Sequence, residues 1–404
     1  MRIIGLAPNE WHGQWVNRQQ LLSRLGLRHQ VLYSTGAWSV WERNTAEWRN
    51  AKARGAAQHA DNVLVEMAPK YLLRWPRWPR FDQFIIRAHA RRLRRLVGPE
   101  GTPLLAAIFH PTYFPYLHHL RPDLVAYHAY DLFEATPGWT AELEALEVAL
   151  LRRADIVTAV SESIATRLRE KVPREIKLLP NGVDLEAFDA AGRTEASVPA
   201  DLARISRPRL GWVGSLHPHV DFGLVAQLAR ARPDWSFVFV GASLRVKDDR
   251  AERELELCRA CPNVHFLGEK HRSEVPEYVA NMDVNLMLYR LSEETWIKAS
   301  HPLKLHEYLA VGKPAVSSDI PSVREFEGVV RIAAGPRDWL QAIEDALASG
   351  GTGTQAERRA VAAQNSWDSR TASLDRLFAQ LVEDRRGGGR SKDGLHAAIN
   401  PGAR

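Results

Sequence analysis

Hydrophobic and polar positions follow two different rhythms along this chain. Short runs of β-branched and other apolar residues are followed by longer amphipathic stretches rich in alanine, leucine and arginine. This alternation is typical of βα units around parallel sheets, because each buried strand leads into a helix that covers the sheet. In the first half, the pattern predicts strands at residues 2–7, 30–33, 62–66, 104–109, 124–127, 156–159 and 176–179. It predicts helices between them at residues 14–25, 81–96 and 139–152.

The periodic pattern is interrupted between Ala190 and Pro208, where Gly, Ser, Thr, Ala and Pro dominate. We interpret residues 191–207 as an interdomain linker, because a loss of periodicity with these residue types marks such boundaries. A second alternating series follows. Its predicted strands lie at residues 209–213, 236–240, 264–266, 284–288, 315–318 and 329–332. Its predicted helices lie at residues 222–232, 250–260, 275–281, 302–310, 336–348 and 371–382.

The two series predict an α/β protein with two Rossmann-like, doubly wound domains that face each other across a cleft. The domains would span residues 1–190 and 208–365, followed by a helix at 366–385 and a disordered tail at 386–404 without apolar period. Doubly wound sheets bind ligands at the carboxyl ends of their strands, so we expect the site in the cleft. The chain has no Walker A sequence and no Gly-x-Gly-x-x-Gly run, which argues against a P-loop NTPase and a dinucleotide oxidoreductase.

The composition narrows the class of protein. Of the 404 residues, 45% are hydrophobic, which is too many for a disordered chain. The net charge of +6 favours an anionic partner. Cys258 and Cys261 are the only cysteines in the sequence, which excludes a disulfide-stapled secreted scaffold and leaves a redox pair or half a zinc site as minor alternatives. The first apolar run stops at Pro8, too early for a signal peptide or membrane anchor, so we expect a cytoplasmic protein.

One segment carries the excess charge. Residues 70–95 hold nine Lys and Arg against one Asp, a balance of +8 that leaves −2 for the rest of the chain. Aromatic residues interleave with these charges, as in surfaces that meet anionic lipid headgroups. A solvated basic helix explains the segment equally well, and no recognisable module supports nucleic-acid binding. The candidate membrane or acceptor patch comprises Trp75, Arg77, Trp78, Arg91, Arg92, Arg94 and Arg95.

Two segments place polar residues at the predicted domain junction. The first, LLPNGVDLEAF, ends a strand with a tight turn that contains Asn181. In the second, HPLKLHEYLAVG, Lys304 and Glu307 lie three positions apart on one helical face, just after a proline that suits a first turn. A lysine near a helix start can neutralise a diphosphate, and the glutamate can accept hydrogen bonds from ribose hydroxyls. As an isolated pattern, such a pair is more often a solvated ion pair.

A third segment, RLGWVGSLHPHVDFGLV, puts Gly214 and Ser215 where a strand leads into a helix. A glycine there lets a phosphate approach the backbone, and the serine adds a hydroxyl. Alone this is a weak signal, because many βα turns contain glycine.

Together these segments resemble the nucleotide-sugar-dependent glycosyltransferases of the GT-B fold, especially bacterial enzymes of teichuronic-acid and exopolysaccharide assembly. The resemblance covers most of the chain, including WHGQWVNRQQLLSRL, AYHAYDLFEATPGW, LRRADIVTAVSESIATRL, LLPNGVDLEAF and PLKLHEYLAVGKPAVSS. It implies a nucleoside-diphosphate sugar bound by the second domain, an acceptor bound by the first, and no metal or other cofactor. The implied donor-binding residues are Lys304 at the diphosphate, Glu307 at the ribose, Gly214 and Ser215 at the phosphates, and Asn181 and Leu303 beside them.

The sequence identifies the catalytic residue less directly than the donor-binding residues. Retaining relatives carry a Glu eight residues before the ribose-binding Glu, and that position is Ala299 here, so the stereochemical outcome stays open. An inverting route needs a base that deprotonates the attacking hydroxyl. Asp131 is the first candidate, because related polysaccharide transferases carry an acidic residue in this loop, although it could instead cap a helix. His128 is the second, since many GT-B enzymes place a functional His at a matching strand end.

Several further residues have more than one interpretation. Trp11 and Trp15 could stack on a sugar or form a helix-packing face. The other histidines show no ligand spacing with a carboxylate or cysteine cluster, so we expect no metal site. The most conspicuous of them are His110, His118, His119, His217 and His219.

We therefore expect a cytoplasmic glycosyltransferase, peripherally attached to the inner face of the cytoplasmic membrane, that acts in cell-surface polysaccharide biosynthesis. It would move a sugar from a UDP-, GDP- or dTDP-sugar to a lipid-linked or polysaccharide acceptor, without binding nucleic acid. Two alternatives stay open. A GT-B nucleotide-sugar epimerase would turn over the donor with no acceptor present, and a non-catalytic protein would bind a nucleotide sugar or lipid without turnover.

Overall fold

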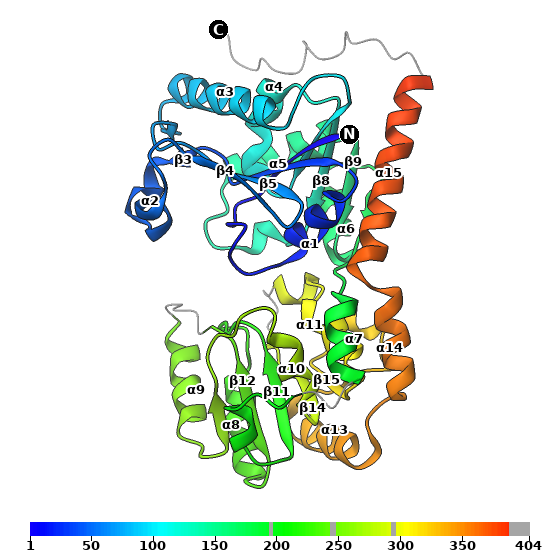
Figure 1. Ribbon diagram of the computed structural model, residues 1–404. Coiled ribbons are helices and arrows are strands. Elements are labelled where there is room, and N and C mark those ends of the chain that lie inside the picture. The colour runs from blue at the N-terminus through cyan, green and yellow to red at the C-terminus, as the bar shows by residue number, and fades with distance from the viewer. Residues whose placement is uncertain (194–196, 243–247, 292–295, 388–404) are drawn as a thin grey trace.

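The chain folds around two separate sheets, which lie in two lobes stacked one above the other (Figure 1). The structure is a computed structural model that describes residues 1–193, 197–242, 248–291 and 296–387. Strands alternate with helices in both lobes, so the α/β class predicted from the sequence is confirmed. The residue ranges of the predicted strands also agree closely with the observed ones, because buried parallel strands leave short apolar runs in the sequence.

The first sheet has eight strands, and every neighbouring pair is parallel except β4 with β5. Three of its central strands are buried along their whole length, as expected for a parallel sheet covered on both faces. The strands lie side by side in the order β10 (Lys177–Leu178), β9 (Ile156–Ala159), β8 (Leu124–Ala129), β7 (Leu104–Ile108), β1 (Arg2–Leu6), β2 (Gln30–Ser34), β5 (Val63–Met67) and β4 (Ala56–Ala60).

The antiparallel edge strand β4 is absent from the elements expected from the sequence. Its sequence, AAQHA, is rich in alanine and exposed at its centre, so it lacks the apolar pattern of a strand. The hairpin is instead set by its turn, because Asp61 and Asn62 have φ values of 49° and 67°. Positive φ at both positions is what a two-residue hairpin turn requires.

The helices of the first lobe cover both faces of its sheet. Thr140 begins one of them by accepting a hydrogen bond from the Leu143 N–H at 3.3 Å. The helices are α1 (Asn17–Leu25), α2 (Ala46–Asn50), α3 (Pro79–Leu96), α4 (Phe114–Leu120), α5 (Ala141–Arg153) and α6 (Glu162–Lys171). Short elements complete the lobe: the two-stranded sheet β3 (Trp38–Ser39) and β6 (Leu73–Arg74), and the turns η1 (Val40–Asn44), η2 (Pro111–Tyr113) and η3 (Phe133–Ala135).

The second sheet has six strands, all parallel. Their order is β13 (Val264–Phe266), β12 (Ser236–Val240), β11 (Arg209–Val213), β14 (Val284–Met287), β15 (Ala315–Ser317) and β16 (Arg331–Ile332). The surrounding elements are α7 (Leu185–Arg193), η4 (Leu202–Arg204), α8 (Phe222–Ala231), α9 (Asp249–Arg259), α10 (Val275–Ala280), η5 (Trp296–Ala299), α11 (Leu303–Ala310), α12 (Pro321–Arg324), α13 (Gly335–Ser349) and α14 (Gln355–Gln364).

The boundary between the lobes lies earlier than residues 191–207, where the sequence pattern put the linker. Phe188 on α7 is buried in the core of the second lobe, together with Leu202 and Ile205. A few buried apolar residues are enough to fix this segment to the second lobe, although the segment as a whole is polar and contains proline. Its average composition does not reveal them. Residues 194–196 of the predicted linker, and residues 388–404 of the predicted tail, lie outside the described residues.

The chain crosses between the lobes through two paired segments. Val183 and Ser366 form an isolated parallel bridge. The Val183 N–H donates to the Asn365 carbonyl at 3.1 Å, and the Trp367 N–H donates to the Val183 carbonyl at 2.9 Å. Gly182 permits this contact, since a Cβ there would lie 2.9 Å from the Asn365 oxygen. These two paired segments are the covalent connections between the lobes, and we call them the hinge.

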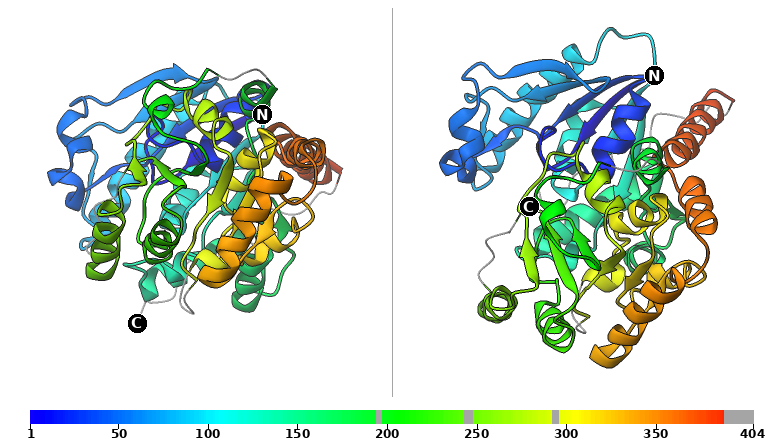
Figure 2. Two further views of the ribbon diagram at one scale, coloured as in Figure 1. Left: turned by 90° about the horizontal axis from the view of Figure 1, so that it is seen from below. Right: turned by 60° about the horizontal axis from the view of Figure 1, so that its bottom comes forward.

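After the second crossing, the C-terminal helix α15 (Trp367–Gly387) returns to the first lobe. It lies beside α1 at the outer side of that lobe (Figures 1 and 2). Leu374 and Phe378 on α15 are buried in one core with Ile3 and Leu21. The last helix is therefore part of the first lobe, although its sequence follows the second.

Candidate active site

A cavity of about 250 Å³ lies between the two lobes. Its walls come from the segments that follow β1 and β8 in the first sheet and β11 and β14 in the second. It therefore occupies the carboxyl ends of strands in both sheets, where doubly wound folds bind ligands. Five of the predicted catalytic and donor-binding residues line it, namely Asp131, Asn181, Ser215, Leu303 and Lys304.

Lys304 lies on the second-lobe wall of this cavity, at the second residue of α11. Its Nζ is 4.4 Å from the centre of the Trp212 ring, and within the described part of the chain it has no ion-pair partner. Burial lowers the pKa of its ammonium group. The N-terminus of α11 opens on the same wall through Pro302 and Leu303, and its helix dipole favours an anion there. This wall is suited to a diphosphate.

Gly214 supports Lys304 in a way that the sequence pattern does not reveal. Its φ of +137° lies in the region that favours glycine. Its N–H donates to the Val240 carbonyl at 2.7 Å, so that amide is already engaged in the sheet. A Cβ at this position would collide with Lys304 Nζ and lie 2.6 Å from Lys304 Cε. The glycine therefore makes room for the lysine, and it is not itself among the residues that line the cavity.

Ser215 and Asn181 connect the cavity walls. Ser215 Oγ donates to Gln14 Oε1 at 3.2 Å, a contact between the two lobes. Asn181 Nδ2 donates to the His301 carbonyl at 2.6 Å. The Asn181 Oδ1 is buried and has no hydrogen-bond partner among the described residues. That amide oxygen is thus an acceptor available to a ligand, and donor binding by Asn181 stays a prediction.

Glu307 lies one helical turn beyond Lys304 and is half-buried. Burial raises the pKa of its carboxyl group, and the charge of Lys304 opposes that effect. It is not one of the cavity-lining residues, so its contact with a donor ribose stays a prediction.

Asp131 faces the cavity from the first lobe and is the only carboxylate among the described residues that line it. Its Oδ1 accepts a hydrogen bond from the Leu132 N–H at 2.9 Å. Burial raises its pKa to about 6, although the Leu132 amide and the charge of Arg18 act in the opposite direction. The turn η3 begins after Leu132, without a side-chain cap. A carboxylate with this pKa suits a general base that works near neutral pH.

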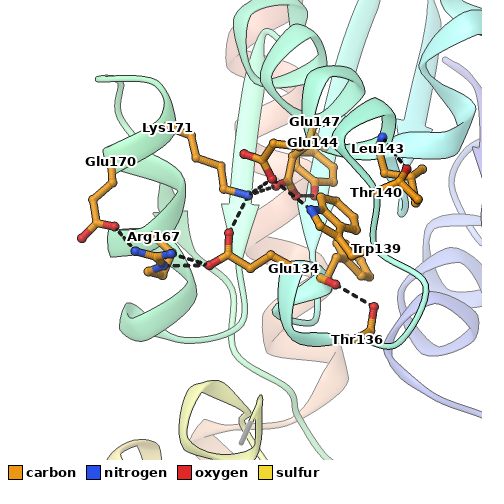
Figure 3. A network of polar contacts seen from close by, with 12 residues as sticks. Glu134, Thr136, Trp139, Thr140, Leu143, Glu144, Glu147, Arg167, Glu170 and Lys171 are labelled. Carbon is orange, nitrogen blue, oxygen red and sulfur yellow. Dashed lines mark hydrogen bonds and ion pairs between the residues drawn. The ribbon is translucent and has the colours of Figure 1, made fainter. Parts of the chain in front are cut away.

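The loop that carries Asp131 is held by a network of ion pairs (Figure 3). Glu134 in η3 pairs with Lys171 on α6 at 2.7 Å. The same ammonium group contacts Glu144 and Glu147 on α5 at 2.8 and 2.6 Å. Trp139 Nε1 donates to Glu144 at 3.0 Å. The loop is therefore tied to two helices, which limits the movement of Asp131.

His128 is placed differently from Asp131. It is buried at the end of β8, where its Nδ1 lies 2.8 Å from Thr158 Oγ1. Burial lowers its pKa to about 3, so the ring is neutral at physiological pH. Its Nε2 is buried without a hydrogen-bond partner among the described residues, and His128 does not line the cavity. Of the two candidate bases, Asp131 is the one that the cavity exposes.

Several cavity residues are not among the candidates named from the sequence, although most of them lie in segments that carry the family resemblance. They come from five separate segments of the chain. They are Asn17, Arg18, Tyr130, Trp212, Tyr289 and His301. His217 and His219 also line the cavity. Among the described residues, no cluster of three or more His, Cys, Asp or Glu side chains is suited to a metal ion.

The two tryptophans and two cysteines that the sequence left with more than one interpretation lie away from the cavity. Trp11 is buried in the first core, where its Nε1 donates to Asp61 Oδ2 at 3.1 Å. The Arg272 guanidinium lies 3.9 Å from the centre of the Trp15 ring. Neither tryptophan lines the cavity. Cys258 and Cys261 are free, buried thiols of the second core.

The basic segment divides into an internal and an external part. Arg92 pairs with the buried Glu66 at 2.9 Å, and Arg94 pairs with Glu100 at 2.7 Å. Arg92 therefore reaches the interior of the first lobe, whereas Arg94 is partly exposed and pairs at the surface. The lipid-facing role of both arginines stays a prediction. Trp78 and Phe84 are 60% and 63% exposed. The exposed basic side chains of the segment are Arg77, Arg80, Arg87, Arg91 and Arg95.

Comparisons with known proteins agree with this geometry. The family model described as Glycosyltransferase Family 4 matches residues 53–187, and the model described as Glycosyl transferases group 1 matches residues 207–349. TuaH of Bacillus subtilis strain 168, described as a teichuronic acid biosynthesis glycosyltransferase, is 30% identical over 288 residues. The match covers 67% of this chain and 69% of TuaH.

Solved structures share the same fold. HepE from Anabaena, in complex with UDP and glucose, is 16% identical with a TM-score of 0.67, and the match covers 94% of this chain and 100% of HepE. A UDP-forming trehalose-phosphate synthase from Burkholderia xenovorans is 15% identical with a TM-score of 0.62, covering 96% of this chain and 100% of the synthase. Two facing α/β lobes, matching family models in each, and the relationship to TuaH together show that this chain belongs to the GT-B glycosyltransferases.

Proposed function

We propose that this glycosyltransferase uses a UDP-sugar and extends a polysaccharide or lipid-linked acceptor in cell-surface polysaccharide biosynthesis. The observation that carries the proposal is that Lys304 and Asp131 line one cavity from opposite lobes, and that Lys304 has no ion-pair partner among the described residues. The structures of HepE with UDP and with UDP-glucose support a UDP-linked donor. The role of TuaH in teichuronic acid biosynthesis supports a glycan acceptor.

In the proposed reaction, the Asp131 carboxylate takes the proton of the acceptor hydroxyl as its oxygen forms a bond to the anomeric carbon. The bond between that carbon and the diphosphate oxygen breaks, and its electron pair leaves with the diphosphate. Lys304 and the N-terminus of α11 stabilise the charge that develops there. No side-chain carboxylate contributes from position 299, because that residue is an alanine.

The proposal also places the enzyme on the cytoplasmic face of a membrane. Exposed arginines on α3 and the exposed rings of Trp78 and Phe84 combine positive charge with apolar surface. Anionic lipid headgroups complement such a face, and aromatic rings settle at the acyl boundary. None of the helices that the structure describes is both long and apolar enough to cross a bilayer.

Calorimetry with UDP tests the donor half of this proposal. Lys304→Ala should weaken UDP binding by about tenfold or more, because a charge-assisted contact is lost. The control is Lys298→Ala, which removes an exposed lysine of η5 and should leave the affinity unchanged. Equal affinity of both variants for UDP would overturn the assignment of Lys304. Turnover of UDP-sugars without any acceptor would instead favour an epimerase.

A further inference from the structure

Arg18 is a buried cation that no part of the described structure neutralises. It is the second residue of α1 and is 4% exposed. Its Nε and Nη1 have no hydrogen-bond partner, and within the described residues it forms no ion pair. Burying a guanidinium without an anion is unfavourable, so such a group is rare unless a ligand completes it.

The surroundings of Arg18 direct it toward the cavity. It lines the cavity wall together with Asn17 and Tyr130, and its guanidinium carbon lies 4.4 Å from the centre of the Tyr130 ring. This stacking holds the guanidinium plane, and hydrogen bonding to Tyr33 and Tyr130 engages part of the group. Nε and Nη1, which have no partner among the described residues, remain for a ligand. Asn17 Oδ1, also buried and without a partner among the described residues, adds a hydrogen-bond acceptor beside it.

None of the neighbouring groups that the structure describes neutralises the positive charge of Arg18 by forming an ion pair with it. The positive charge of Arg18 opposes the rise in the pKa of Asp131, but the two groups do not form an ion pair. Tyr33, Tyr130 and His110 also feel its charge, and none of them is an anion at neutral pH, since burial raises the pKa of both tyrosines. The cavity wall thus offers a fixed guanidinium next to the proposed base.

We propose that Arg18 binds an anionic group of the acceptor, a carboxylate or a phosphate, and thereby selects acidic acceptors. This inference rests on the proposed function, because it assigns Asp131 to the acceptor hydroxyl. The donor diphosphate already has a cation and a helix N-terminus on the second lobe, at Lys304 and Leu303. Arg18 comes from the first lobe, on the same side as Asp131, where the acceptor would approach.

The test compares three probes that share an octyl chain: octyl glucuronide, octyl phosphate and octyl glucoside. Binding is measured by calorimetry with the full chain, with and without UDP. The wild-type protein should bind at least one acidic probe about tenfold more tightly than octyl glucoside, because a charge-assisted contact is gained. Preference for the glucuronide identifies a uronic-acid acceptor, and preference for the phosphate identifies a phosphate-bearing one.

Arg18→Gln should remove the preference for the acidic probe and leave the affinities for octyl glucoside and UDP within about twofold of wild type. Arg18→Lys should keep part of it, because the charge remains but the planar fork is lost. Arg24→Gln is the matched control, since Arg24 lies on the same helix but pairs with Asp368 at 3.0 Å outside the cavity. Removal of an unpaired buried charge should not lower the melting temperature.

Equal affinity of the wild-type protein for all three probes would overturn the inference. A loss of UDP affinity in Arg18→Gln as large as the loss of acidic-probe affinity would also overturn it, because the guanidinium would then serve the donor. A wild-type protein that binds no UDP would instead contradict the proposed function. The measurements without UDP would still decide the role of Arg18.

Discussion

At the scale of single residues, the site depends on how burial tunes Asp131. A carboxylate acts as a base only when ionised, and burial raises the pKa of Asp131 to about 6. We expect kcat/KM for transfer to increase about tenfold per pH unit below pH 6 and to level off above it. Asp131→Glu should move the midpoint of this rise. A profile that stays flat through this range would contradict the role of Asp131.

Gly214 offers a second test at this scale. Gly214→Ala should weaken UDP binding by about tenfold, because the new Cβ would displace the Lys304 ammonium group. The substitution also strains a backbone with φ of +137°. Gly101→Ala is the matched control, since Gly101 has φ of +141° and nothing within 4 Å of an added Cβ. The control should lose stability without losing UDP affinity, and equal UDP affinity in both variants would refute the steric argument.

Some residues of the site could be predicted from the sequence, and others could not. Lys304 and Asp131 could be predicted because each follows a recognisable strand or helix start within a family motif. Arg18 was not, since an arginine at a helix position is usually solvent-exposed, and its burial is decided by contacts with Tyr130 far along the chain. The steric role of Gly214 could not be predicted either, because Lys304, for which it makes room, is distant in the sequence.

At the scale of elements, the buried strands were predictable and the edges were not. β1, β7 and β8 are buried throughout and mostly apolar, since helices cover both faces of the sheet. β4 is an exposed edge whose position depends on a turn. The return of α15 to the first lobe could not be predicted from the sequence either, because it depends on which of the two cores Phe378 packs into.

The helix α3 carries the prediction about membranes. Replacing Arg87, Arg91 and Arg95 by Ala should weaken binding to anionic vesicles, measured by flotation, by about a hundredfold, because each exposed arginine near such a surface is worth on the order of 1 kcal/mol. Flotation of the wild-type protein should also fall with added salt. A control with the same loss of charge replaces Arg230, Arg253 and Arg259, exposed residues of the second lobe. Salt-independent flotation, or equal loss in both variants, would contradict the assignment.

At the scale of the whole molecule, the two lobes contact each other through several separate segments. The paired segments around Val183 and Ser366 form the hinge. Elsewhere, Arg272 of the second lobe pairs with Asp61 at 3.2 Å and stacks on Trp15, while Ser215 reaches Gln14. A donor bound to one lobe and an acceptor bound to the other are thereby brought to a single cavity, which is what transfer between two substrates requires.

The most direct test of this account measures UDP affinity and sugar transfer together in Asp131→Asn. The substitution keeps the size of the side chain and removes its ability to take a proton. We expect UDP affinity within about twofold of wild type and a loss of transfer of about a hundredfold or more. Undiminished transfer, or a loss of UDP affinity that accounts for the whole loss of transfer, would contradict it.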